Sequence, residues 1–491
     1  MYFVGIDIGT TSVKIIAINE NGEIVKSVSK EYPISFPKPL WSEQNPEDWW
    51  EQCIVGLNEL LDDLDKSKVK AISFSGQMHG MVTLDENDKT IRPAILWNDQ
   101  RTEKECEYLN NVVGQSKISS WTGNLALPGF TAPKVLWLKE NEPENFKAVK
   151  KIMLPKDYIA YKMSGIFATD MSDASGTLYL DVKNRKWSLE MLEVLGVSES
   201  QLPKLLESYE VVANIKSDLA AELGLRDDVK IVIGGGDQAV AAVGGAVVKP
   251  GSCSLSLGTS GVVFTSNEQF FVDENNSLHS FCHANGKYHL MGVTLAAAAS
   301  LKWWIETIIK TENYEELLKE AKEAEVDDNV FYLPYLMGER TPHNDPNCRG
   351  TFIGLNMIHE RKHMTRAVLE GVAFSLRDTF EIIKEMGIAI DSISINGGGA
   401  RSELWCEIIA DVLNVTVNKL NTNDGPAYGA AILATVGFGL FNTVEEACSK
   451  YINITDSIAP NAKNAEIYNK KYDKFRKIYP ATKELFKQLN N

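Results

Sequence analysis

The sequence predicts an α/β protein built from two similar lobes with a central cleft. The chain has 491 residues, which is too long for one ordinary domain. β-Branched runs alternate with glycine turns and helical segments, as expected of an α/β fold. A strand, a Gly-Thr turn and a second strand occur within residues 2–18 and again within 252–266. A repeat separated by half the chain indicates two related lobes that enclose a cleft.

Composition and charge exclude several classes of protein. The chain is 44% apolar and 24% charged, which is normal for a globular protein with a large core. A net charge of −16 argues against a nucleic-acid partner. No apolar run is long enough to cross a membrane, and the first 14 residues do not resemble a signal peptide. Seven cysteines without a CxxC pair predict free thiols, and we expect a cytoplasmic protein.

The chain begins with a predicted antiparallel meander of three strands. Residues 2–9 and 13–18 form the first two strands, and the turn Gly9-Thr10-Thr11-Ser12 joins them. Asn21-Gly22 is a strong hairpin signal and predicts that a third strand follows.

Helices and strands continue through the rest of the first half. A capping Asn45 followed by Pro46 predicts a helix that runs to about Leu64. Residues 112–230 are expected to alternate helix and loop. The further predicted strands are residues 69–76, 81–85 and 94–101.

The second half repeats this plan after Gly251. Residues 252–266 predict a strand, a Gly-Thr turn and a strand. Residues 366–386 predict a long amphipathic helix, and residues 392–397 predict a strand that enters a glycine-rich turn and a helix. The last 45 or so residues are expected to form charged helices on the surface.

The stretch 231–246 contains the strongest candidate for a catalytic group. The run 231–233 predicts a buried strand, three glycines allow a sharp turn, and an apolar helix follows Asp237. An acid at the start of a helix, just past a strand, points into the crevice at the strand ends, as a general base does in α/β enzymes. The alternative is that Asp237 only caps the helix.

Asp7 lies between two isoleucines on a predicted central strand, where an acid is costly unless it meets a cation or hydrogen-bond donors. The following Gly9, Thr10 and Thr11 offer backbone N–H groups and hydroxyls to phosphate oxygens, with Asp7 holding Mg²⁺ through water. A plain hairpin with a solvated Asp7 is the alternative. The same turn recurs at Gly258-Thr259, and this recurrence favours phosphate binding.

Two polar motifs follow other predicted strands. QMHG, residues 77–80, lies at a strand end, where α/β proteins bind ligands. His79 could donate a hydrogen bond to a substrate hydroxyl, or it could be structural. In WNDQR, Trp97 beside Asn98 and Asp99 suits a sugar face and its hydroxyls, and a polar loop anchored by the tryptophan is the alternative.

Glycine-rich and cysteine-containing motifs give weaker signals. GGGAR, residues 397–401, lies between a strand and a helix and suits an anion or nucleotide, although tight packing explains it equally well. The sequence has no GxxxxGK[ST] motif, and no GxGxxG follows the first strand. His279, Cys282 and His283 lack a second ligand pair, so zinc is not expected there.

Together these motifs resemble the FGGY carbohydrate kinases of the actin-like ATPase superfamily, in the family's order and over nearly the whole chain. QMHG, ATDMSDASGT and GERTPH are most similar to the members that phosphorylate D-xylulose. The resemblance implies two ribonuclease-H-like lobes: residues 1–246 with the sugar site and catalytic base, and residues 247–491 with the nucleotide site. It also implies ATP and Mg²⁺ as cofactors, and similar proteins are frequently homodimers.

The resemblance also implies roles for individual residues. Asp237 would be the catalytic base, and Asp7 would lie near Mg²⁺ and the phosphates. Gln238 departs from the small polar residue expected after the base, which leaves the local hydrogen bonding open. Arg340 and His343 are interpreted as structural or lobe-closing. The implied sugar-side residues are Met78, His79, Trp97, Asn98, Asp99 and Asp237. The implied nucleotide-side residues are Gly9, Thr10, Thr11, Gly258, Thr259, Gly398, Gly399 and Ala400.

Rival functions remain open at this point. The nearest is the same chemistry on ribulose, gluconate or glycerol. A non-catalytic sugar sensor and an actin-like assembly protein are further alternatives, but neither needs a positioned base beside a small polar pocket. A redox or metal enzyme lacks the necessary cysteine and histidine spacing.

Overall fold

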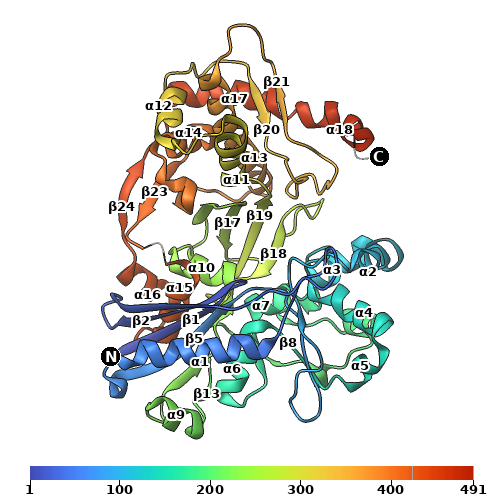
Figure 1. Cartoon of the computed structure of the whole chain (residues 1–491), viewed down its shortest axis with the longest axis vertical. Coiled ribbons are helices and arrows are strands. Elements are labelled where there is room, and N and C mark those ends of the chain that lie inside the picture. Colours follow the sequence, from blue (N-terminus) through green and yellow to red (C-terminus); the bar gives the residue numbers. More distant parts are fainter. Residues whose placement is uncertain (423, 490–491) are drawn as a thin grey trace.

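A seven-stranded sheet lies at the centre of each lobe (Figure 1). The structure is a computed structural model that describes residues 1–422 and 424–489. The first sheet has the order β13 (Val211–Asn214), β14 (Lys230–Val232), β5 (Val69–Gly76), β1 (Tyr2–Ile8), β2 (Ser12–Asn19) and β3 (Ile24–Glu31), with β15 (Gly235–Gly236) also beside β5. The second has the order β18 (His279–Cys282), β19 (Tyr288–Thr294), β17 (Gly261–Asn267), β16 (Cys253–Leu257), β22 (Ser392–Asn396), β23 (Thr416–Leu420) and β24 (Ile454–Ile458).

The two sheets share one topology. In the first, β1, β2 and β3 form an antiparallel meander, and β5 and β14 then run parallel to β1. In the second, β16, β17 and β19 form the meander, and β22 and β23 run parallel to β16. The Gly-Thr turns link the first two strands of each meander. The two similar lobes that the sequence repeat predicted are therefore present, and the shared strand order extends beyond the repeat to the parallel strands.

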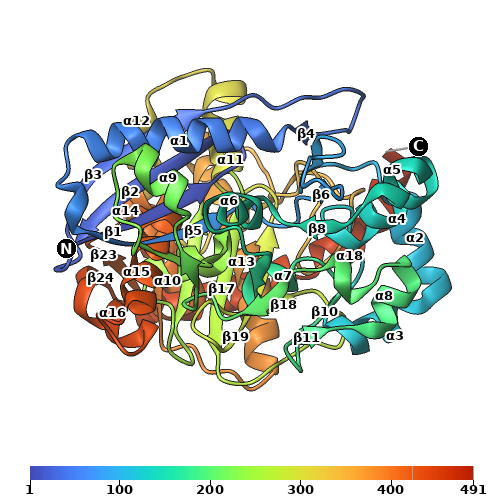
Figure 2. The same cartoon turned by 90° about the horizontal axis from the view of Figure 1, so that it is seen from below.

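Helices cover both faces of the first sheet (Figure 2). Helix α1 (Pro46–Asp62) packs on one face, and the Asn45 side chain caps it by accepting from the Glu47 N–H, as predicted. Helices α10 (Asp237–Gly244) and α15 (Gly425–Phe438) pack on the other face. Buried residues alternate between these two layers along β1 and β2, which explains why both strands are apolar along most of their length.

The last part of the chain returns to the first lobe. Helix α15 packs so tightly against β1 and α10 that a Cβ at Gly5 would lie 2.0 Å from the Ala427 carbonyl oxygen. A Cβ at Gly429 would lie 1.9 Å from the Val240 carbonyl oxygen. Helix α16 (Val444–Tyr451) joins the same core. A domain division between residues 246 and 247 stays a prediction.

The second lobe contains the long helix α13 (Arg361–Glu385), which begins five residues before its predicted start, and α14 (Glu403–Leu413). The C-terminal helices are α17 (Ala462–Phe475) and α18 (Ile478–Leu489). The expectation that they are charged surface helices was wrong for the inner faces of both. Tyr468, Tyr472 and Phe475 of α17 and Ile478, Tyr479 and Phe486 of α18 enter the core. Lys471 is also buried and pairs with Glu370. Residues 490–491 of that predicted segment lie outside the described part.

Three smaller findings concern other predictions. The predicted strand 94–101 is only β7 (Ala94–Ile95), because the polar residues that follow form a turn held by side-chain contacts. All seven cysteines are free and buried. No helix among residues 1–422 and 424–489 combines the length and apolar character of a membrane span.

The remaining elements connect these layers. The short strands are β4 (Glu43–Gln44), β6 (Val82–Leu84), β8 (Lys151–Met153), β9 (Ala168–Asp170), β10 (Leu180–Asp181), β11 (Lys186–Trp187), β12 (Lys204–Leu206), β20 (Phe331–Leu333) and β21 (Thr351–Ile353). The α-helices are α2 (Glu103–Glu107), α3 (Gln115–Thr122), α4 (Thr131–Asn141), α5 (Pro143–Ala148), α6 (Pro155–Ser164), α7 (Met171–Ser175), α8 (Leu189–Leu195), α9 (Ser217–Leu223), α11 (Ala298–Lys302) and α12 (Tyr314–Lys322).

Candidate active site

Three neighbouring parallel strands end at one edge of the first sheet. Their register aligns Asp7 of β1 with Ser75 of β5, and Ser75 with Gly235 of β15. Asp237 and the segment Gln77–His79 follow directly beyond these strand ends. The predicted base and acid and the segment with Met78 and His79 therefore lie at the strand ends, where α/β folds bind ligands.

Each position of the GGGD turn requires glycine for a separate physical reason. Gly234 has a φ of +71°, and a Cβ there would lie 1.9 Å from the Phe74 carbonyl oxygen. A Cβ at Gly235 would lie 2.6 Å from the Ser172 hydroxyl, and one at Gly236 would lie 3.0 Å from the Met78 side chain. The turn is thus pressed between β5, Ser172 and Met78, and this packing fixes where Asp237 leaves the backbone.

Asp237 is the first residue of α10 and not its cap. The cap position belongs to Gly236, and no side chain fulfils the capping role. Burial, and secondly the charge of Asp7, raise the pKa of Asp237 to about 7. A carboxylate with that pKa at a partly exposed helix N-terminus suits a general base near neutral pH.

Asp7 is the second acid of the site. Burial raises its pKa to about 6, against the opposing effects of Ser75 and Lys14. Its Oδ1 atom is buried and has no hydrogen-bond partner among residues 1–422 and 424–489. Lys14 is paired elsewhere, with Asp424 Oδ1 at 2.6 Å. Two carboxylates that interact electrostatically, one with an unsatisfied oxygen, form a donor set that fits a hard divalent cation such as Mg²⁺.

His79 points its ring into the same region from a backbone φ of +70°. Its Nδ1–H donates to the Gly176 carbonyl oxygen at 2.6 Å, because a carbonyl can only accept. Burial lowers the pKa of His79 to about 3, so the ring is neutral and Nε2 carries the lone pair. The expectation that His79 donates to a substrate hydroxyl was therefore wrong, and Nε2 is an acceptor. The adjacent Met78 is buried.

The WNDQR residues lie in different environments. Trp97 is 43% exposed, and its indole N–H donates to the Thr10 hydroxyl at 3.0 Å. Asn98 has a buried side-chain oxygen without a hydrogen-bond partner in the described part of the chain. Asp99 is fully buried and binds Arg101 through both oxygens and the Ser42 N–H at 2.6 Å. Trp97 is thus open to a ligand, Asn98 keeps an unsatisfied buried oxygen, and Asp99 shapes the loop.

The Gly-Thr turn of the first lobe is held from behind. The Gly9 N–H donates to the Ser12 carbonyl, and the Gly9 carbonyl accepts from the Tyr32 hydroxyl at 2.5 Å. The Thr10 carbonyl accepts from Gln44 at 2.7 Å. Thr11 is exposed. These contacts hold the turn, and its Thr10 hydroxyl also accepts from the Trp97 indole N–H.

A cavity of about 1100 Å³ lies in the second lobe. Thr259 of the repeated turn and Gly398 and Gly399 of GGGAR form part of its wall. Gly258 lies in the same turn and Ala400 packs partly against the core, so their contact with a nucleotide stays a prediction. Four cationic side chains also line the cavity: Lys302, Lys319, Lys322 and Arg401. All the residues that line this cavity belong to the second lobe.

The GERTPH loop contains a residue whose environment the sequence did not reveal. Glu339 accepts from the Leu295 and Arg340 N–H groups, and Thr341 donates its N–H to Val293 at 3.0 Å. The guanidinium of Arg340 makes no hydrogen bond or ion pair within residues 1–422 and 424–489, and its charge helps to lower the pKa of His79. Arg340 is therefore near the sugar-side residues on a rigid loop. No local sequence pattern indicated this.

His343, Cys282 and His283 make structural contacts. His343 binds the Tyr335 hydroxyl at 3.1 Å and stacks on Tyr479, in agreement with its interpretation from the sequence. His283 Nε2 lies 2.7 Å from the Val247 carbonyl and Cys282 Sγ faces the Val182 carbonyl, so these ligand atoms do not converge. Within residues 1–422 and 424–489 no group of three or more His, Cys, Asp or Glu side chains is arranged to hold a metal.

Comparison with known proteins agrees with this architecture. Models of the FGGY family of carbohydrate kinases match at residues 2–244 for the N-terminal domain and 253–438 for the C-terminal domain. The chain is 40% identical to the xylulose kinase of Bacillus subtilis over 99% of this chain and 98% of that protein. It is 42% identical to the xylulose kinase of Escherichia coli over 97% of this chain and 98% of that protein.

Solved structures give the same result. The ligand-bound xylulose kinase of Lactobacillus acidophilus superposes with a TM-score of 0.95 at 29% identity and covers 99% of each chain. A gluconate kinase from the same organism has the same TM-score, identity and coverage. With both family domains matched and close relatives over nearly the full length, the chain belongs to the FGGY family of carbohydrate kinases.

Proposed function

We propose that this kinase transfers the γ-phosphoryl group of ATP to the 5-hydroxyl of D-xylulose and forms D-xylulose 5-phosphate. The observation that carries the proposal is the carboxylate of Asp237, whose pKa of about 7 suits a base, at the strand ends where the segment Gln77–His79 also begins. The similarity to xylulose kinases supports the choice of sugar.

Asp237 accepts the proton of the attacking hydroxyl as its oxygen bonds to phosphorus. His79 Nε2 accepts a hydrogen bond from another sugar hydroxyl, and Trp97 offers an apolar face beside Asn98. The front of the Gly9–Thr11 turn faces phosphate oxygens, and the Thr259, Gly398 and Gly399 wall receives the nucleotide. Closure of the lobes is needed to join these groups and to exclude water from the phosphoryl group.

Mg²⁺ belongs to this proposal. Asp7 would hold it, directly or through water, with Asp237 nearby. When bound, the ion neutralises charge on the phosphates during transfer. It also offsets the repulsion between the two carboxylates.

The substrate is tested by a panel of sugars with coupled detection of ADP. D-Xylulose is expected to give the highest kcat/KM, above D-ribulose, gluconate and glycerol. Gluconate is included because a similar structure is described as a gluconate kinase. A higher kcat/KM for any of the other three would replace D-xylulose as the substrate. ATP-dependent light scattering without sugar would indicate an assembly protein instead.

Two further properties belong to the proposal. A homodimer follows from the resemblance noted above, and sedimentation velocity measures it directly. A cytoplasmic location agrees with seven buried free thiols.

A further inference from the structure

A buried polar cluster lies behind the turn that carries Asp237. Lys156 of α6 lies 2.6 Å from Asp157, 3.0 Å from Asp170 and 3.8 Å from Asp173. All four side chains are at most 1% exposed. One cation among three acids is costly in a protein interior unless the groups are firmly hydrogen-bonded or one acid is neutral.

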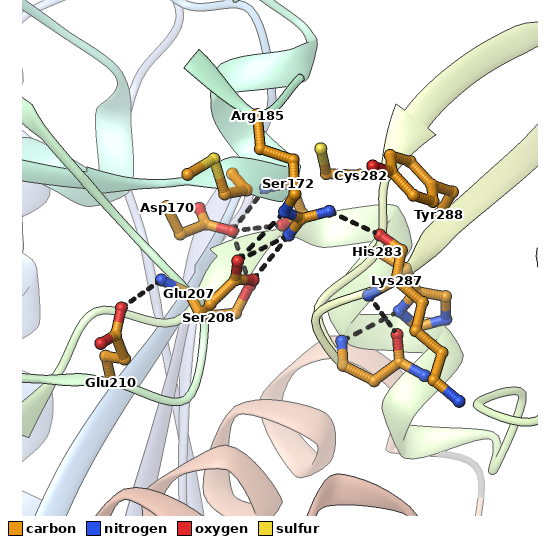
Figure 3. A network of polar contacts seen from close by, with 12 residues as sticks. Asp170, Ser172, Arg185, Glu207, Ser208, Glu210, Cys282, His283, Lys287 and Tyr288 are labelled. Atoms are coloured by element: carbon orange, nitrogen blue, oxygen red, sulfur yellow. Dashed lines mark hydrogen bonds and ion pairs between the residues drawn. The ribbon is translucent and has the colours of Figure 1, made fainter. Parts of the chain in front are cut away.

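Asp170 organises the side of the cluster that faces the turn. It ends β9, caps α7 and lies beside Lys156. Its Oδ2 atom accepts hydrogen bonds from the hydroxyls of Ser172 and Ser208, as Figure 3 shows. One carboxylate oxygen therefore sets the orientation of two serine hydroxyls.

The two serines contact the glycine turn in different ways. The Gly236 N–H donates to the hydroxyl oxygen of Ser172 at 3.1 Å. The Gly234 N–H donates instead to the backbone carbonyl of Ser208 at 3.0 Å. Replacing either serine by alanine removes a hydroxyl from Asp170, but only the change at Ser172 also removes a partner of the turn.

We propose that Ser172, held by Asp170, is a positioning residue that fixes the backbone from which Asp237 projects. Ser172 gives its proton to Asp170 and so directs a lone pair at the Gly236 N–H. Gly236 caps α10 and immediately precedes Asp237. A shift of this peptide would move the carboxylate away from the sugar hydroxyl, and small misplacements of a base are costly to rate. This inference rests on the proposed role of Asp237.

The cluster acts through position and not through charge. Both oxygens of Asp173 are buried without a hydrogen-bond partner in the described part of the chain. Burial raises the pKa of Asp173 well above its usual range, against the effect of Lys156. Burial therefore disfavours the ionised form of Asp173 and limits the negative charge that it adds near Asp237.

The test compares Ser172→Ala with Ser208→Ala in the full-length enzyme. Both serines are fully buried and donate to the same Asp170 oxygen, so Ser208→Ala is a matched control. We expect similar losses of melting temperature, but a fall in kcat of about 10- to 100-fold for Ser172→Ala only, with KM for sugar and ATP within about threefold. Equal effects on kcat, or an unchanged kcat in Ser172→Ala, would overturn the inference.

Two more variants complete the design. If Ser172→Ala does not fold, Ser172→Cys keeps the size with a weaker acceptor and should give an intermediate kcat. Asp173→Asn should leave the pH midpoint of kcat unchanged, and a shift of about half a pH unit or more would mean that the cluster acts through charge. A wild-type enzyme that is inactive on every sugar would refute the proposed function itself. No outcome of the variant comparisons resembles that result, so the two failures are distinguishable.

Discussion

Replacing Asp237 by asparagine should inactivate the enzyme and also stabilise it at high pH. Burial and the nearby Asp7 raise the pKa of Asp237 from 3.8 to about 7 in the folded protein. The protonated carboxyl therefore stabilises the fold fully below pH 4, and this contribution is lost as the pH rises through about 7. Above pH 8 the wild-type protein carries the whole penalty of an ionised carboxylate, whereas an asparagine carries none.

The size of the effect follows from the pKa. A rise of about three units corresponds to about 4 kcal/mol at about 1.4 kcal/mol per unit. Asp237 is partly exposed, so solvent screening reduces this to about 2 kcal/mol. At pH 5 only about a third of the penalty has developed, so the advantage of Asp237→Asn over wild type should be about threefold smaller there.

The assay is thermal or urea unfolding of both proteins at pH 5 and pH 8, without nucleotide or metal. Asp62→Asn, on the exposed side of α1, is the control and should leave the free energy of unfolding unchanged at both pH values. An equal gain in the free energy of unfolding of Asp237→Asn over wild type at the two pH values, or a variant less stable than wild type at pH 8, would contradict this prediction.

Three other predictions concern the cavity of the second lobe, the packing of α15 in the first lobe and the role of Arg340. Gly398→Ala should fold normally, because no atom lies within 4 Å of the new Cβ, but its methyl group enters the cavity and should weaken ATP binding several-fold, as measured by calorimetry. In Gly399→Ala the new Cβ meets Trp405 at 2.9 Å, so this variant should lose about 1–3 kcal/mol of stability. Gly429→Ala places a methyl group against backbone and should lower stability by about 3 kcal/mol or more, so a normal unfolding midpoint would contradict the packing of α15. Arg340→Met should raise KM for the sugar about tenfold with little change in KM for ATP, and Arg340→Lys should recover part of the loss; equal changes in both KM values would argue against a sugar contact.

The sequence predicted the parts of the site that depend on local patterns. The Gly-Thr turns and the GGGD turn are recognisable because β-branched runs, glycines and an acid follow one another within a few residues. The strands that precede them were found for the same reason. The register that aligns Asp7 with Ser75 follows from strand pairing, and the sequence alone does not contain it.

Long-range partners account for what the sequence did not predict. Asp99 binds the backbone of Ser42, and nothing in WNDQR indicates that its carboxylate is occupied. His79 was expected to donate to a substrate hydroxyl. Its N–H donates instead to the carbonyl of Gly176, 97 residues later, and the sequence does not show that contact. The return of α15 to the first lobe was also missed, since its apolar sequence fits any buried helix.

Turnover by Asp237→Ala, measured together with calorimetric binding of D-xylulose, shows whether Asp237 is the general base. We expect the sugar still to bind while kcat falls by about 10²–10⁴-fold, as expected when a general base is lost. Turnover near that of the wild-type enzyme, with the sugar bound, would show that another group accepts the hydroxyl proton.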